Sequence, residues 1–258
     1  MSLSIQFDGG SSRLFRSINL ASYNIFKSAE KISSGLRINV ASDDPAGLVI
    51  SEHLRSQIAG LNQNIENTSA LIRKYETASS TVSELRSHLT ELRSLAVGAA
   101  NEGGNSEAGQ LAYQRVAEHS VASFNRVIET ADYNGANLLD GSEGSVAAVD
   151  ELSGIDLSTA ESAQASIAII DNAAAKLDES QAEMGAYQKS ELEARMSNLE
   201  TTLGNLEAAE SQIRDADIIS EVSNFIASNI RQRAGIAMLA HLQMNSRTVI
   251  DLLDYGRE

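Results

Sequence analysis

The sequence of 258 residues contains no cysteine and no tryptophan, one proline, and only 4 % aromatic residues. Without cysteine, the chain can form no disulfide framework, thiol nucleophile or thiolate metal site. Because aromatic anchors are so few, any core must be a narrow seam of aliphatic side chains. The single proline, Pro45, leaves the rest of the chain free to be helical. These absences favour an extended helical building block over a compact catalyst.

Motifs of catalysis and of metal binding are also missing. The histidines do not stand at the spacing of a zinc-binding helix, no Gly-x-Ser-x-Gly elbow occurs, and no glycine cluster has the spacing of a phosphate-binding loop. Two carboxylate pairs, Asp43-Asp44 and Asp215 with Asp217, flank expected helix starts and are better explained as helix caps. We therefore expect no catalytic residues, no metal, no cofactor and no enzymatic activity.

The charge of −15 is spread unevenly. Residues 11–37 hold five bases and one acid, a net of +4, whereas residues 140–183 hold one base and ten acids, a net of −9. Most of the chain would repel phosphate, so we expect no nucleic-acid partner. No apolar run approaches the length of a membrane span, and residues 1–10 lack the layout of a secretory signal peptide. We expect no membrane insertion and, for a secreted protein, a route other than the general secretory one.

Two long segments carry apolar residues at alternating gaps of four and three, the pattern of coiled coils and helical bundles. At about 1.5 Å per residue, each helix would extend roughly 75–80 Å. The sequence therefore predicts a mainly α fold, a long antiparallel helical rod with both chain ends at one end. The two stripes are Leu54, Ile58, Leu61, Ile65, Ile72, Tyr75, Val82, Leu85, Leu89 and Leu92, and then Ala163, Ile167, Ile170, Ala174, Leu177, Met184, Leu199, Leu203, Leu206 and Ile213.

Capping residues and glycines predict the remaining boundaries. A first helix over residues 11–34 should end at Gly35, and Asp44-Pro45 suits the start of the long helix. A shorter helix is expected at 107–130. Turns and a small β-hairpin are expected in 132–158, and the last helix should follow Asp217.

The end segments, 11–34 and 216–253, carry apolar stripes outside the rod pair. Burial inside the monomer is one explanation, and burial against other copies of the chain is the one we favour. We therefore predict subunit assembly through these segments and the joint between them and the rod, at residues Leu14, Ile18, Ile25, Ile32, Leu36, Arg37, Ile38, Asn39, Ile219, Val222, Ile226, Ile230, Leu252 and Leu253.

Several motifs resemble the signatures of bacterial flagellins. Residues 33–58 read Ser-Ser-Gly-Leu-Arg-Ile-Asn-Val-Ala-Ser-Asp-Asp-Pro-Ala-Gly-Leu-Val-Ile-Ser-Glu-His-Leu-Arg-Ser-Gln-Ile, which is similar to the N-terminal signature. Residues 60–63, 91–97 and 133–135 continue the match. At the other end, 208–217, 234–235 and 237–240 resemble the C-terminal signature. The similarity extends over nearly the whole chain.

This resemblance implies a structural subunit that self-assembles into the extracellular flagellar filament for swimming, exported by the flagellar type III apparatus without a cleaved signal. The implied partners are other flagellin subunits, an export chaperone, the filament cap and hook–filament junction proteins. The implied domains are an inner-domain helix and spoke at 1–44, rod parts at 45–140 and 159–214, and a C-terminal inner-domain helix at 215–258. A hairpin and turn region, 141–158, stands in place of the variable outer domain, so the chain is a short form.

The chain departs from the family at residues 4–10, at Leu242 to Arg247 with the tail that follows, and at Glu91. Flagellins sensed by Toll-like receptor 5 generally carry arginine at the position of Glu91, whereas Arg93 and Leu95 keep the family pattern. The resemblance thus implies a receptor-contact region at Glu91, Arg93 and Leu95, and weak sensing. Two alternatives to a filament flagellin stay open: the hook–filament junction protein, and a flagellin-like secreted effector or adhesin.

Overall fold

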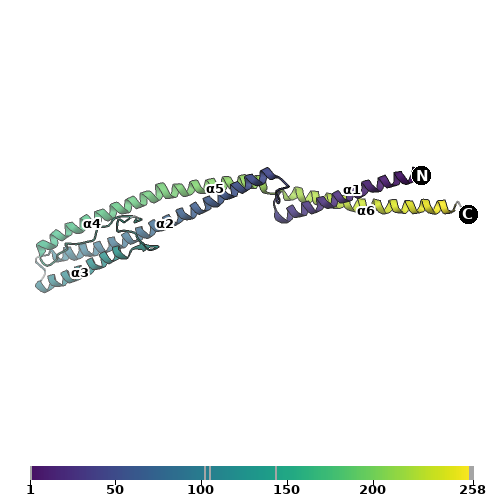
Figure 1. Cartoon of the computed structure of the whole chain (residues 1–258). Helices are drawn as coiled ribbons and strands as arrows, with labels where there is room; N and C mark the ends of the chain where they lie inside the picture. Colours follow the sequence, from purple (N-terminus) through teal and green to yellow (C-terminus); the bar gives the residue numbers. More distant parts are fainter. Residues whose placement is uncertain (1, 102, 105, 143, 256–258) are drawn as a thin grey trace. The chain divides into compact units, whose positions relative to one another are not determined.

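The computed structural model describes the backbone of residues 2–101, 103–104, 106–142 and 144–255, and the side chains of 10–101, 103–104, 106–142, 144–245 and 248. The described chain is mainly helical, with one small antiparallel hairpin, which confirms the predicted fold class (Figure 1). Its elements are α1 (Ser2–Ser34), α2 (Pro45–Ala99), α3 (Glu107–Thr130), β1 (Asp132–Tyr133), β2 (Ala136–Asn137), α4 (Ala160–Tyr187), a π-turn η1 (Gln188–Leu192), α5 (Glu193–Arg214) and α6 (Ile218–Tyr255).

The chain divides into two compact units. We call residues 1–59 and 204–258 the terminal unit, and residues 60–203 the rod unit. The terminal unit holds α1, α6, the first turns of α2 and the last turns of α5. The rod unit holds the rest of α2 and α5, with α3, the hairpin and α4. Each unit is described by itself.

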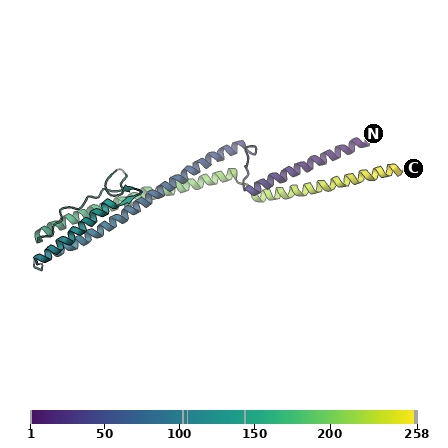
Figure 2. The same cartoon turned by 60° about the horizontal axis from the view of Figure 1, so that its bottom comes forward.

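The rod unit is built around an antiparallel pair, α2 and α4, with α3 alongside in both views (Figures 1 and 2). The ion pairs Arg86–Asp178 and Arg93–Asp171 show the direction, because the number rises on one helix as it falls on the other. Apolar side chains fill the core, including Val82, Leu85, Leu89 and Leu92 of α2, Phe124 and Ile128 of α3, Leu138, Leu139 and Leu157 of the connecting segments, and Ile170, Leu177 and Met184 of α4. The seam predicted from the heptads is therefore buried or half-buried in this unit.

Helix caps lie where the sequence placed them. The Asp44 carboxylate accepts a hydrogen bond from the amide of Gly47 at 2.9 Å, which fixes the start of α2 at Pro45. Asp217 accepts from the amide of Ile219 at 3.0 Å and so caps α6. Gly35 ends α1 with a φ of +72°, a conformation that costs glycine little. Helix α1 begins at Ser2, earlier than the predicted residue 11.

The hairpin lies at the start of the 132–158 region in which it is predicted, before the 141–158 segment of the implied domains. Its strands pair Asp132 with Asn137 and Tyr133 with Ala136. Asn134 and Gly135 form the loop, with φ of 56° and 79°. Two central residues with positive φ make the tight turn whose twist suits a two-residue hairpin, and Asn-Gly is its strongest signal. The described residues of 141–158 are mostly irregular, with a single bridge between Asp140 and Ala148.

The second long helix is interrupted, contrary to the prediction of a continuous helix to Arg214. Between α4 and α5, residues Gln188–Leu192 form a π-turn, in which the amide of Glu193 bonds to the carbonyl of Gln188 five residues back. The sequence holds one residue more here than the heptad pattern needs, and a π-turn absorbs one extra residue.

Candidate assembly surfaces

In the terminal unit, α1 and α6 pack side by side, as both views show (Figures 1 and 2). On α1, Ala21 and Ser28 are buried, and one face between them is half-buried against α6. Polar contacts cross the seam: Gln232 donates to Ser22 at 2.7 Å, and Ser28 donates to Glu221 at 3.0 Å. The helices approach so closely at Gly235 that a Cβ there would lie 2.7 Å from Ile18 Cγ1.

This seam contains the four predicted assembly residues of α1. Leu14, Ile18, Ile25 and Ile32 are half-buried and share the heptad face of Ala21 and Ser28. Because α6 covers much of this face, its residues are partly buried inside the monomer, which is the other explanation of the apolar stripe. Their role between subunits stays a prediction.

The outward faces of the two helices carry most of the uncovered apolar side chains of the terminal unit. The four predicted residues of α6 are exposed: Ile219 by 82 %, Val222 by 37 %, Ile226 by 51 % and Ile230 by 61 %. The sequence reasoning missed a matching set on α1, where Phe15, Leu20, Tyr23 and Phe26 point outward. The sequence signal that could have revealed this set is the concentration of aromatic residues on α1, in a chain that has very few aromatic residues. The side chains of Leu252 and Leu253 lie outside the described residues.

The segment from Gly35 to Asp44, the joint, connects α1 to α2 and contacts the end of α5. The amide of Arg37 donates to the carbonyl of Arg214 at 2.6 Å, and its guanidinium donates to the carbonyl of Ile213 at 2.5 Å. These bonds satisfy carbonyls that the C-terminus of α5 would leave free. Ile38 is only 1 % exposed. Of the predicted joint residues, Leu36, Arg37 and Ile38 thus make contacts inside the terminal unit, and Asn39 is half-buried beside them.

One ion pair fastens the joint to α1, and a second links α2 to α5 beside it. Asp43 binds Lys27 of α1 and accepts from the amides of Asn39 and Val40, each at 3.2 Å. The hydrogen bond from Lys27, followed by those from the backbone, lowers the pKa of Asp43 to about 2. Farther along, Arg214 of α5 pairs with Glu52 of α2 at 2.8 Å and lowers the pKa of that carboxyl group.

In the rod unit, the three residues of the predicted receptor-contact region differ in availability. Glu91 is exposed on α2. The guanidinium of Arg93 donates to Asp171 at 2.7 Å, which raises the pKa of Arg93. Leu95 is half-buried and packs against the core cluster. The three residues share one stretch of helix, in which Glu91 and Arg93 are exposed and Arg93 is held by an ion pair.

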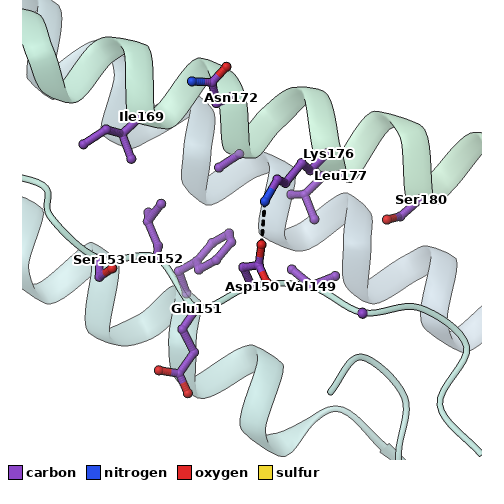
Figure 3. A pocket seen from close by; sticks show the side chains of 13 residues that line it. Val149, Asp150, Glu151, Leu152, Ser153, Ile169, Asn172, Lys176, Leu177 and Ser180 are labelled. Carbon is purple, nitrogen blue, oxygen red and sulfur yellow. Dashed lines mark hydrogen bonds and ion pairs between the residues drawn. The ribbon is translucent and has the colours of Figure 1, made fainter. Parts of the chain in front are cut away.

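A pocket of about 280 Å³ opens in the rod unit between residues 148–153 and α4 (Figure 3). Phe124, Leu152 and Leu177 form apolar walls, and Lys176 meets Asp150 at 2.6 Å across the opening. This pair lowers the pKa of Asp150 and raises that of Lys176. The pocket presents no nucleophile with an adjacent base. Over the described residues, no group of three or more His, Asp or Glu side chains could hold a metal ion.

Comparison with known proteins identifies a family whose members resemble this chain. Residues 9–144 match the helical N-terminal region of bacterial flagellin, and residues 167–253 match its helical C-terminal region. The chain is 36 % identical to the flagellin of Halalkalibacterium halodurans, over 88 % of this chain and 91 % of that protein. It is 31 % identical to flagellin FlaB1 of Treponema pallidum, over 92 % and 95 %, and 31 % identical to the flagellin of Bacillus subtilis, over 88 % and 92 %.

The helical core of the rod unit, the exposed apolar faces of the terminal unit and the flagellin matches in both halves of the chain define a structural subunit of a self-polymerising assembly. The chain belongs to the bacterial flagellin family. It is a structural subunit of the extracellular flagellar filament. These matches give no support to a hook–filament junction protein or to a secreted effector. None of the described helices is long and apolar enough to cross a membrane.

Proposed function

We propose that subunits join in the filament through the outward faces of the terminal unit. Ile219, Val222, Ile226 and Ile230 of α6 form one contact surface, and Phe15, Tyr23 and Phe26 of α1 form another. The observation that carries the proposal is their exposure, because contiguous apolar side chains on a soluble chain mark interaction surfaces. The seam residues Leu14, Ile18, Ile25 and Ile32, with Leu36 to Asn39 of the joint, hold the unit in shape and border these surfaces. Leu252 and Leu253, whose side chains lie outside the described residues, belong to the same proposed set of assembly residues.

The protein acts as a building block and not as a catalyst. Its buried side chains are almost all aliphatic, and the buried polar ones are serines and a threonine. Family membership supports further partners: an export chaperone, the filament cap and hook–filament junction proteins. It also supports export through the flagellar type III apparatus. The inner domain comprises residues 1–44 and 215–258, and the rod domain lies between them.

Filament formation by purified protein tests this function directly. Ile226→Glu should abolish filaments seen by electron microscopy while the helical circular dichroism and thermal midpoint of the monomer stay unchanged, because the side chain contacts solvent. Thr202→Glu, at an exposed position of α5, is the matched control and should assemble normally. Filaments of normal length from Ile226→Glu would show that this face of α6 is not part of the subunit interface.

We also propose that the chain is a weak ligand of Toll-like receptor 5. Glu91 is exposed and offers acceptors only, where an arginine fork would suit a carboxylate or carbonyl surface. A reversed charge at a desolvated contact costs about 2–5 kcal/mol, or roughly one to three orders of magnitude in affinity. Arg93 already forms an ion pair with Asp171, so this second basic side chain is less available to a receptor.

A reporter-cell titration checks the receptor proposal. Glu91→Arg should raise the signal of the monomer by at least about tenfold. Glu84→Arg is the matched control, since Glu84 is exposed on the same face of α2 one heptad earlier. Strong signalling by the natural chain, unimproved by Glu91→Arg, would contradict the proposal.

A further inference from the structure

The second helix of the rod pair contains one residue too many. Its inward residues before the π-turn repeat every seven positions, as Ala163, Ile170, Leu177 and Met184, and all four are buried. The repeat resumes at the last residue of the turn, as Leu192, Leu199, Leu206 and Ile213. From Met184 to Leu192 the gap is eight. A gap of seven would have placed Glu191 and Asn198 inward instead.

The facing helix has no matching insertion. On α2 the inward positions Leu54, Leu61, Thr68, Tyr75, Val82, Leu89 and Ala96 repeat every seven residues without a break. The extra residue is therefore carried by one partner of the pair alone. The π-turn Gln188–Leu192 is the local solution, because its wider loop takes up one residue and returns the helix to phase.

The side chains on either side hold the turn in place. Met184 and Leu192 are 3 % and 1 % exposed. Moving the turn one heptad toward the N-terminus would put Gly185 inward in place of Met184 and leave a cavity. Moving it one heptad toward the C-terminus would put Glu191 inward in place of Leu192 and bury a carboxylate. The irregular turn is thus confined to the residues between these two anchors.

The turn lies where the packing of the rod unit becomes thinner. Toward the hairpin, α3 and residues 131–157 add to the core, whereas none of the described residues of α5 is buried. Tyr75 stacks on Tyr187 with ring centroids 5.0 Å apart, and Tyr187 remains 44 % exposed. Gly185 precedes the π-turn by three residues. A Cβ at Gly185 would meet open space, so packing does not require a glycine there.

We propose that the π-turn at Gln188–Leu192 is a built-in yielding point of the rod unit, at which α4 and α5 bend and open before the rest of the helix does. Wide helical turns are established sites of bending, and an opening is cheapest where few buried contacts are lost. The anchors Met184 and Leu192 keep the motion local. A subunit with such a point can adjust the line of its rod to its neighbours while its core stays closed.

Amide hydrogen exchange of the full-length monomer tests the proposal. Amides of residues 186–193 should exchange roughly tenfold or more faster than those of 165–182, which lie in the same long helix. Deleting the exposed Ser190 brings Met184 and Leu192 seven residues apart. That variant should lose the difference and unfold at a higher temperature.

Two control variants separate the turn from a general effect of chain length. Deleting the exposed Thr201 leaves the turn in place but moves Leu206 and Ile213 out of phase, so it should lower the unfolding temperature and keep fast exchange at 186–193. Ser190→Ala keeps the length and should keep the fast exchange. Uniformly slow exchange from 165 to 200 in the natural chain would overturn the proposal. So would unchanged exchange at 186–193 after Ser190 is deleted.

Discussion

The terminal unit and the rod unit divide the properties of the molecule between them. Of the 21 buried apolar residues among the described part of the chain, 19 lie in the rod unit and two, Ala21 and Ile38, in the terminal unit. Of the 21 large apolar residues that are exposed, 15 lie in the terminal unit. The terminal unit holds 11 bases and 13 acids, a net of −2, whereas the rod unit holds nine and 22, a net of −13.

The difference separates a part that is complete in the monomer from a part that is not. The rod unit covers its apolar side chains and surrounds them with charge, which favours solubility. The terminal unit is close to neutral and leaves aliphatic and aromatic faces bare, which favours association. Stability and assembly therefore reside in different residues, and variants should affect one without the other.

Removing both chain ends should have the largest effect. A chain of residues 45–215 keeps the rod core but lacks α1, the joint and α6. We expect a monomeric, strongly helical protein that forms no filaments under conditions where the full chain assembles, as electron microscopy and sedimentation would show. Filaments from the truncated chain would place the assembly surface in the rod and undo the comparison.

A charge in the rod core should come next. Leu89 is 1 % exposed, so Leu89→Asp buries a carboxylate without a partner and should cost about 3–5 kcal/mol of folding free energy. Thermal unfolding followed by circular dichroism measures the loss. Thr90→Asp adds the same charge at the next, exposed position and should change the midpoint little. A midpoint equal in both variants would mean that Leu89 faces solvent.

The close contact between α1 and α6 should be sensitive to the addition of side-chain atoms. Gly235→Val would place a Cβ 2.7 Å from Ile18 Cγ1 and should cost about 1–3 kcal/mol. Because the seam lies in the terminal unit, filament stability should fall while unfolding of the rod unit is unchanged. Adding Ile18→Ala to Gly235→Val opens the space and should restore part of the filament stability. No recovery in the double variant would mean that the two helices are not in contact there.

Acid should weaken the joint through Asp43, with the smallest effect. The pKa of this carboxyl group is lowered from 3.8 to about 2, chiefly by the hydrogen bond from Lys27. Its contribution to stability is therefore present above about pH 4 and is lost as the pH falls toward about 2. The natural chain should lose roughly a few degrees more of its thermal midpoint over this range than Asp43→Asn. Parallel pH curves for the two proteins would show that Asp43 contributes nothing.

Local chemistry made much of the fold predictable. Asp44 and Pro45 mark the start of α2 because a carboxylate cap and a fixed φ act within one helical turn. Asn134-Gly135 carries its own turn signal, and the hairpin lies within the 132–158 region where it is predicted. The heptad phase of α2 was predictable because one side of that helix is apolar along most of its length.

The pairing of α1 with α6 was not readable, because a stripe does not identify what covers it. Helix α6 carries apolar residues on more than one face: Phe225 and Leu239 lie toward α1 and are half-buried, while Ile226 and Ile230 are exposed. Periodicity alone could not choose between these faces. The π-turn did leave a sequence signal, the extra residue between Met184 and Leu192. A single gap of eight is easily overlooked, however, in a pattern of apolar residues spaced by three and four.

The contact between Arg37 and Ile213 has a consequence for the order in which the molecule forms. These residues are 176 positions apart, whereas Asn125 and Leu152 in the rod unit, which share two hydrogen bonds, are 27 apart. Closing the longer loop costs more entropy, and contacts of high sequence separation form slowly. The joint and the seam between α1 and α6, where Gln232 bonds to Ser22 at a separation of 210 positions, are therefore the last parts of the fold to close. During synthesis, α1 leaves the ribosome first and has no helix to pair with until α6 is complete.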